Sequence, residues 1–138
     1  MDKNKIYTGS CLCGAIHYQI CGEIGPIIQC HCQRCRKANG TAFATNAPVA
    51  KAAFQWTQGE AYLKKFKSTA TTERCFCREC GSPLISIKAH DPDVYRLRIG
   101  SLDTPLTEKP TQHIFVASKA QWDEIHDDLP QYETFPNQ

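Results

Sequence analysis

The sequence contains no long apolar run and no strong excess of either charge. No stretch approaches the roughly 18 apolar residues that a membrane-spanning helix needs, and residues 1–10 lack the apolar segment of a secretory signal peptide. The formal net charge is only +2, which argues against a nucleic acid as an obligatory partner, because such proteins usually carry a strongly basic surface. We therefore expect a cytoplasmic protein without a membrane partner.

Internal repeats, low-complexity tracts and linker-like segments are also missing from the 138 residues. Apolar residues make up 41% of the chain and charged residues 22%. This is an ordinary balance for a soluble domain that builds its own core. The sequence therefore predicts one domain over residues 1–138.

Cysteine, by contrast, is abundant. The chain has nine: Cys11, Cys13, Cys21, Cys30, Cys32, Cys35, Cys75, Cys77 and Cys80. A reducing compartment disfavours stable disulfides, and an odd number leaves at least one thiol unpaired. The alternative is a secreted, disulfide-bonded domain, but thiols so close in sequence are hard to place in separate unstrained bridges. The cysteine pattern therefore indicates metal binding.

Short runs of alternating residues predict a mostly β fold of short folded antiparallel sheets, stapled by zinc. In residues 14–20, Ile16, Tyr18 and Ile20 share one face of a strand. In residues 94–99, two arginines alternate with three apolar residues. The predicted strands are 14–20, 26–29, 41–46, 53–57, 62–67, 71–76, 84–88 and 94–99.

Two short helices are predicted as well. The first follows Cys32 as a helical turn closed by an Asn-Gly pair, so that the thiols of the segment QCHCQRCRKANG lie at a corner between strand and helix. The second begins near Ser118, where residues 118–121 resemble a capping box, and buries Trp122 and Ile125. Residues 129–138 contain two prolines and should lie extended along the domain.

The spacing of the cysteines predicts two different metal sites. Glycine follows both Cys13 and Cys80, where it permits a tight turn whose backbone N–H groups reach the sulfur atoms. No group of close-set cysteines closes a tetrahedron alone. We therefore pair Cys11 and Cys13 with Cys77 and Cys80 as one structural zinc site, which ties the first strand to the second half of the chain.

The remaining close-set group consists of Cys30, Cys32 and Cys35, followed by arginine instead of glycine. Three thiolates leave one tetrahedral position free, which is typical of a catalytic zinc that acts as a Lewis acid. Soft thiolate ligands favour a thiol substrate over water. The cations that neighbour the group and that we expect to hold a small anionic substrate are Arg34, Arg36 and Lys37, although a solvated turn surface has the same composition.

The other cysteines and the histidines leave alternatives open. Cys21 and Cys75 are each either a small buried hydrophobe or a fourth ligand. Because Cys75 would share a strand face with Cys77, it is a candidate for either site. His31 lies between two cysteines but points away from both in an extended backbone. The isolated histidines, which are more typical of satisfied core or surface residues than of ligands, are His17, His90, His113 and His126.

The sequence resembles the glutathione-dependent formaldehyde-activating enzyme family, which includes the centromere protein V type. The resemblance covers nearly the whole chain and rests on GSCLCGAIHY, QCHCQRCRKANGTAFA, FQWTQGE, RCFCRECGSPL and HIFVASKAQWDEIHDDLPQYE. It implies folded β-sheets around two zinc ions per chain, one structural and one catalytic. The matching ligands are Cys11, Cys13, Cys77 and Cys80 for the first ion and Cys30, Cys32 and Cys35 for the second. Cys75 stands where the family pattern usually has no ligand.

By resemblance, the activity is the condensation of glutathione, or another small thiol, with formaldehyde or a related aldehyde. This reaction gives S-hydroxymethylglutathione and is classed as that of a carbon-sulfur lyase. The thiolate sulfur would be the nucleophile that attacks the aldehyde carbon. The alternative is a non-catalytic zinc module for a nucleic acid or protein partner, whose basic surface would combine the cations near the triplet with Lys64, Lys65 and Lys67.

Overall fold

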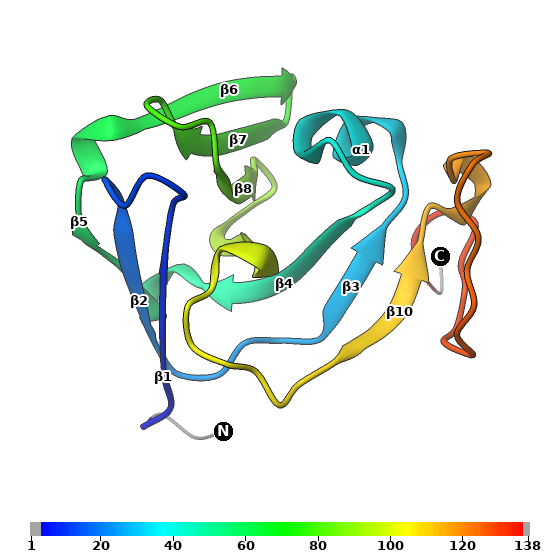
Figure 1. Cartoon of the computed structure of the whole chain (residues 1–138), viewed down its shortest axis with the longest axis horizontal. Coiled ribbons are helices and arrows are strands. Elements are labelled where there is room, and N and C mark those ends of the chain that lie inside the picture. The colour runs from blue at the N-terminus through cyan, green and yellow to red at the C-terminus, as the bar shows by residue number, and fades with distance from the viewer. Residues whose placement is uncertain (1–3, 137–138) are drawn as a thin grey trace.

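Two β-sheets and one α-helix make up the computed structural model, which describes residues 4–136 (Figure 1). The strands are β1 (Ile6–Ser10), β2 (His17–Cys21), β3 (Ile27–Cys30), β4 (Ala44–Ala50), β5 (Phe54–Gln58), β6 (Leu63–Thr69), β7 (Thr72–Cys77), β8 (Pro83–Lys88), β9 (Asp91–Arg98) and β10 (Pro110–Ile114). The helix is α1 (Gln33–Asn39), and the short 3-10 turns are η1 (Lys51–Ala53), η2 (Glu60–Tyr62), η3 (Ile99–Ser101) and η4 (Val116–Ser118).

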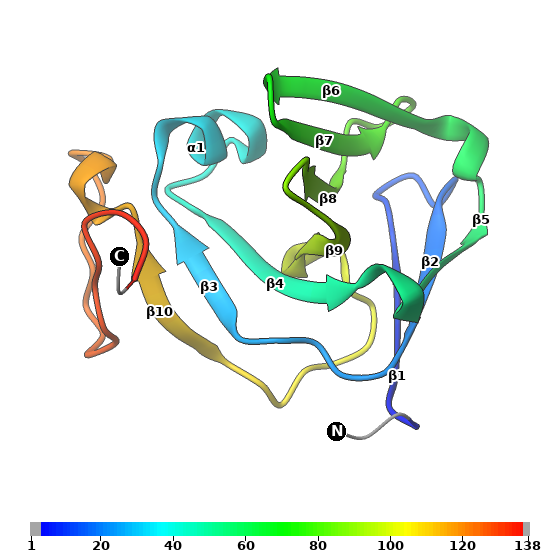
Figure 2. The ribbon, with the colours of Figure 1, turned by 180° about the vertical axis from the view of Figure 1, so that it is seen from behind.

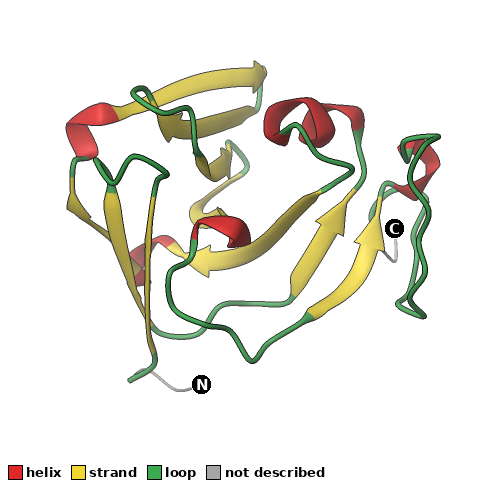
Figure 3. Cartoon of the chain, in the orientation of Figure 1, coloured by secondary structure: helices red, strands yellow, loops and turns green. Residues whose placement is uncertain are grey.

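The two sheets are almost entirely antiparallel. The smaller has three strands in the order β1-β2-β5, and the larger has seven in the order β10-β3-β4-β9-β8-β7-β6. Only the pair β10 and β3, side by side in Figure 1, is parallel. Figure 3 shows how strands dominate the fold, with α1 above the ends of β3 and β4. The predicted fold class, mostly β with folded antiparallel sheets, is confirmed.

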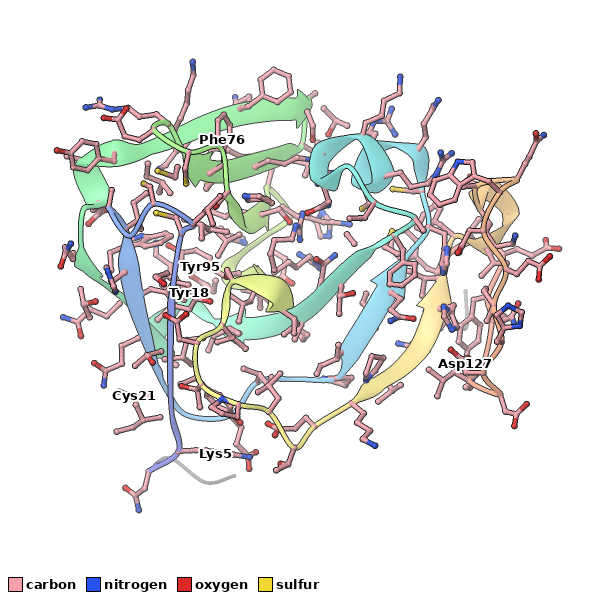
Figure 4. The ribbon with its side chains drawn as sticks, in the orientation of Figure 1. Lys5, Tyr18, Cys21, Phe76, Tyr95 and Asp127 are labelled. Atoms are coloured by element: carbon pink, nitrogen blue, oxygen red, sulfur yellow. The ribbon has the colours of Figure 1, made fainter. Side chains whose placement is uncertain are left out.

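Every predicted strand range overlaps an observed strand, from β2 to β9. The predicted alternation in β2 is confirmed, because Ile16, Tyr18 and Ile20 are all almost fully buried. Phe54 of β5 stacks on Tyr18 with 5.0 Å between ring centroids and also contacts Tyr95 of β9 (Figure 4). These aromatic contacts join the two sheets in the main core.

The larger sheet has one apolar face and one cationic face. Directly paired residues of antiparallel strands point to the same side of a sheet. Ser86 pairs with both Arg74 and Arg96, and Asn46 pairs with Arg98, so these polar side chains share one face. Figure 2 shows β9 from behind, between β4 and β8. The row that faces the main core instead is Cys75, Ile85, Leu97 and Ala47.

The first predicted helix is confirmed, and the second is wrong. Helix α1 begins after Cys32 and ends at Gly40, whose backbone has φ +67°. Residues 119–130 form a turn and irregular backbone, and Trp122 is 72% exposed. The Lys119 ammonium instead donates to the carbonyl groups of Ala120 and Asp123. Such local bonds compete with helical ones.

The C-terminal segment runs alongside β10 as predicted. Gln131 forms a parallel bridge with His113, and the Tyr132 N–H donates to the His113 carbonyl at 3.0 Å. Of the predicted extended range 129–138, residues 137 and 138 lie outside the described residues. None of the helices in residues 4–136 has the length and apolarity that a membrane span requires.

We predict that Gly59→Ala strongly destabilises the fold. Gly59 has φ +74°, and an added Cβ would lie 1.8 Å from the Ala15 carbonyl oxygen. The left-handed backbone and the steric overlap together should cost roughly 2 to 5 kcal/mol of unfolding free energy. The matched control is Gly40→Ala, where φ is also positive but nothing lies within 4 Å, so we expect a loss of about 1 to 2 kcal/mol. Equal losses in urea unfolding would contradict the steric argument.

Candidate functional site

Seven cysteine sulfur atoms gather in two separate clusters. In each cluster, all sulfur atoms lie within 4.8 Å of one another. The first cluster contains Cys11, Cys13, Cys77 and Cys80, and the second contains Cys30, Cys32 and Cys35. The structure thus brings together the same sets that the glycine placement pairs in the sequence.

The geometry of the first cluster fits a tetrahedral zinc ion. Zinc–sulfur bonds measure about 2.3 Å, so the sulfur atoms of a regular tetrahedron stand about 3.8 Å apart. The Cys13 sulfur is 3.7 Å from that of Cys11 and 3.8 Å from that of Cys77. A donor set of four thiols is typical of a closed, structural zinc site.

Two glycine turns shape this first cluster. Gly14 and Gly81 both have φ +79°, which L-amino acids with a Cβ rarely adopt. The turns bring backbone donors to sulfur: the Ile16 N–H donates to Cys11 Sγ at 3.3 Å, and the Glu79 N–H donates to Cys77 Sγ at 3.4 Å. Such outer hydrogen bonds orient thiolate ligands and stabilise their negative charge.

The second cluster, which we call the triplet, stands on a corner between strand and helix. Cys30 ends β3, Cys32 caps the start of α1, and Cys35 is buried within the first turn of that helix. The Cys35 N–H donates to Cys32 Sγ at 3.3 Å. Among residues 4–136, no fourth cysteine, histidine or carboxylate joins the triplet. Three sulfur donors suit a zinc ion that keeps one coordination position for a substrate.

The close packing of the triplet thiols shifts their pKa values in opposite directions. The neighbouring thiols of Cys30 and Cys35 stabilise the Cys32 thiolate and lower the pKa of Cys32 to about 2. The same contact with Cys32 raises the pKa of Cys30. The positive charge of Arg74 also favours the Cys32 thiolate.

Buried cations on the sheet face the triplet. Arg98 is 6% exposed and donates from Nη1 to Asn46 Oδ1 at 2.6 Å. Burial lowers the pKa of Arg98 to about 10, and the charges of the triplet thiols oppose this shift. Burial also lowers the pKa of Lys88, again against the thiol charges. Sequence reasoning missed these cations as site residues. The signal for Arg98 in the sequence was the alternation of arginines in β9.

The three cations predicted to hold substrate do not act as one group. Arg34 lines a cavity between α1 and β6–β8 that also contains Arg74 and Arg98. Arg36 turns to the other side, where its Nη2 donates to the Ser118 carbonyl at 3.2 Å. Lys37 is exposed on α1. Arg34 is therefore the predicted cation that shares a cavity with the buried arginines.

Neither remaining cysteine joins a cluster. Cys75 is 1% exposed in the main core, and burial raises the pKa of Cys75 to about 11. Cys21 is exposed at the end of β2, far from α1, where Gln19 donates to its sulfur at 3.5 Å (Figure 4). The interpretation as a small buried hydrophobe is confirmed for Cys75 and wrong for Cys21, which is exposed. The alternatives that made either cysteine a fourth ligand are wrong as well.

A chain of polar side chains, buried at His31 and His113 and exposed at Asp127, runs from the triplet corner to the C-terminal segment. His31 Nε2 lies 2.9 Å from His113 Nδ1, and His113 Nε2 lies 3.0 Å from both carboxylate oxygens of Asp127. Figure 4 shows Asp127 on the C-terminal segment. His31 is fully buried and His113 nearly so. Burial lowers the pKa of His31. His31 thus turns away from the triplet, as predicted, and His113 is a satisfied core residue.

Comparisons with known proteins agree on one family. A family model described as glutathione-dependent formaldehyde-activating enzyme matches residues 6–118. A Halomonas elongata protein named "Putative glutathione-dependent formaldehyde-activating enzyme" is 28% identical over 128 residues, which cover 87% of this chain and 81% of that protein. A Schizosaccharomyces pombe protein named an "uncharacterized lyase" is 32% identical over 78 residues, or 56% of this chain. This match spans about half of the yeast protein, 55% of its length.

A solved structure also resembles this fold. The crystal structure of a Rhodobacter sphaeroides protein matches with a TM-score of 0.60 at 21% sequence identity. The match covers 72% of this chain and 91% of that one. At this identity, the likeness shows the fold alone.

We predict that Cys77→Ala unfolds the protein. Structural zinc contributes roughly 10 to 16 kcal/mol of apparent binding free energy in small peptides, and the net stability of a domain is about 5 to 15 kcal/mol. The control is Cys21→Ser, which removes an exposed thiol outside both clusters and should melt like the parent. Circular dichroism melting and zinc content are the measurements. A Cys77→Ala variant with the parent's melting curve would refute the structural role.

We also predict that His113→Ala destabilises the zinc-loaded protein by about 1 to 3 kcal/mol, because it leaves buried His31 without its partner. The matched control is His126→Ala, since the His126 side chain is 82% exposed and its loss should change the unfolding free energy by less than about 0.5 kcal/mol. Urea unfolding measures both. Equal effects would show that the buried chain contributes little.

Proposed function

Because the chain belongs to the glutathione-dependent formaldehyde-activating enzyme family, we propose that it is a zinc-dependent enzyme of the carbon-sulfur lyase type. It joins glutathione, or a related thiol, to formaldehyde or another small aldehyde and gives an S-hydroxymethyl adduct. The family model spans residues 6–118, a range that contains both sulfur clusters. The observation that carries the proposal is the triplet, which offers three sulfur donors without a fourth among the described residues.

The two clusters have different roles in this proposal. Cys11, Cys13, Cys77 and Cys80 hold a structural zinc ion, and the triplet holds a catalytic one. A zinc ion bound by the triplet supplies Lewis-acid stabilisation of a thiolate, which lowers the pKa of an incoming thiol. The buried chain through His31 and His113 fixes the strand end from which the triplet projects. Rigid support of this kind keeps reacting groups in a productive geometry.

The joining reaction needs no oxidant or reductant. The thiol loses its proton, and its sulfur forms a bond to the aldehyde carbon. The carbonyl π electrons move to the oxygen, which takes up a proton and becomes the hydroxyl group of the adduct. In the reverse direction the carbon-sulfur bond breaks, which is the lyase reaction. The cationic sheet face with Arg74, Lys88 and Arg98 would stabilise negative charge near the triplet. Both substrates are small and soluble, which suits the cytoplasmic location that we propose.

The alternative, a non-catalytic zinc module for a nucleic acid or protein, has weaker support. Lys64, Lys65 and Lys67 are exposed on β6. Because strand residues alternate between faces, Lys64 points to the opposite side from the other two. Arg36 is occupied at the Ser118 carbonyl. Nucleic-acid affinity that falls steeply with added salt would favour this module.

We predict that Cys32→Ala reduces adduct formation to the uncatalysed rate while the fold remains. The variant should bind one zinc ion per chain instead of two and melt close to the parent, because the four-cysteine cluster is intact. NMR spectroscopy with isotope-labelled formaldehyde measures adduct formation, and metal analysis measures the zinc content. The control is Cys21→Ala, which should keep both zinc ions and the full rate. A Cys32→Ala variant that retains catalysis would contradict the catalytic role proposed for the triplet.

A further inference from the structure

A cavity of about 410 Å³ lies between α1 and the hairpin strands β6–β8. Three guanidinium groups line it: Arg34 from α1, Arg74 from β7 and Arg98 from β9. The apolar part of the lining contains Phe66, Phe76 and Ile85. Figure 4 marks Phe76 at β7. Among the described residues that line the cavity there is no carboxylate. The cavity is therefore positively charged and partly apolar.

The guanidinium groups of this cavity have no carboxylate partner among the described residues. Within residues 4–136, none of the three forms an ion pair. Arg74 donates from Nε to Ser68 Oγ at 3.0 Å, while its Nη1 is buried without a hydrogen-bond partner. Arg98 has only the neutral Asn46 amide as partner. Burying unpaired charge is costly, and an anion bound between the two guanidinium groups would offset that cost.

The cavity adjoins the triplet. Arg34 and Ala38 lie one helical turn apart on α1 and both line the cavity, and Cys35 lies between them in the sequence. Cys30 pairs with Ala44 on β4, and Arg98 pairs with Asn46 two residues further along the same strand, so Cys30 and Arg98 lie on the same face of the sheet. A molecule that fills the cavity therefore has its anionic end close to the position where its sulfur would react.

A second cavity, of about 540 Å³, shares Arg98 and Pro83 with the first but differs in charge. Its lining includes the Asp103 carboxylate and the hydroxyl groups of Ser10 and Ser101. Asp103 would repel a carboxylate. An anionic group is therefore better accommodated on the α1 and β7 side of Arg98.

We propose that the cavity between α1 and β6–β8 binds a carboxylate of the thiol substrate through Arg74 and Arg98, with Arg34 at its rim, and so selects acidic thiols over neutral ones. The assignment of this ligand as a substrate rests on the proposed function. The planar guanidinium fork matches a carboxylate with two parallel hydrogen bonds. The apolar part of the lining accommodates the uncharged part of the molecule between carboxylate and sulfur.

Calorimetric titration of the zinc-loaded full chain tests this assignment. The ligands are glutathione, S-methylglutathione, which has no thiol and reports on the cavity alone, and the diethyl ester of S-methylglutathione. The parent should bind S-methylglutathione at least about tenfold more tightly than the diethyl ester of that compound. Arg74→Gln should remove this preference, and Arg74→Lys should restore part of it. The matched control is Lys67→Gln, which removes the same charge from an exposed position on β6 and should leave the preference intact.

The preference for acid over ester is the decisive readout, because a merely structural role of Arg74 would weaken both ligands alike. Equal binding of acid and ester by the parent, or an undiminished preference in Arg74→Gln, overturns the assignment, as does the absence of binding. If Arg74→Gln does not fold, Arg34→Gln against Lys37→Gln on the same helix gives the same comparison at exposed positions. A twofold to fivefold loss in Arg34→Gln alone supports a rim contact, and no loss in the preference contradicts it.

The proposed function is tested separately by adduct formation. If glutathione and a neutral thiol such as 2-mercaptoethanol form adducts with equal kcat/KM, the proposed reaction is supported and the selection of acidic thiols is contradicted. If binding of S-methylglutathione depends on Arg74 but no thiol forms an adduct faster than the uncatalysed reaction, the cavity assignment is supported and the proposed reaction is contradicted.

Discussion

Sulfur atoms from turns 64 residues apart in sequence meet at 3.8 Å, where Cys13 faces Cys77. One turn links β1 to β2 and the other links β7 to β8, so this contact fixes the small sheet against the large one. The position of β7 matters beyond stability, because Arg74 projects from it toward α1 and the triplet. The positions of the triplet and of the nearby cations therefore depend on a contact between sulfur atoms of the four-cysteine cluster at the other side of the sheet.

The two sulfur clusters differ in the backbone that follows their cysteines. In the first, glycine with φ +79° after Cys13 and Cys80 allows a turn that directs N–H groups to sulfur. In the triplet, arginine follows Cys35, and the chain continues as a helix. Four thiolates around a divalent ion leave two negative charges, whereas three leave one. In the proposed function, buried Arg98 and half-buried Lys88 would offset the latter charge, which would suit a site that takes up one more anionic sulfur.

Local sequence signals predicted the elements whose interactions are local. The alternation in β2, the strands β2 to β9 and the end of α1 at Gly40 all follow from neighbouring residues. Strand β10 was missed because it pairs in parallel with β3, far along the chain. Strand β1 pairs with the neighbouring β2 and was missed because its residues IYTGS show no clear alternation of apolar and polar side chains. The capping signal near Ser118 was overridden instead by local bonds, from the Lys119 ammonium to the carbonyl groups of Ala120 and Asp123. The contact between His31 and His113 joins residues 82 positions apart, so local signals could not predict it. That Arg74 and Arg98 share one face of the sheet likewise follows only from the strand register.

The chain of polar side chains from His31 to Asp127 also imposes an order on biosynthesis. A ribosome adds about 5 to 20 residues per second, and Asp127 is translated almost a hundred residues after His31. For roughly 5 to 20 seconds, the nascent polypeptide therefore presents the triplet thiols without the segment that later packs behind them. During this interval, the strand end that carries the triplet lacks the support of His113 and Asp127.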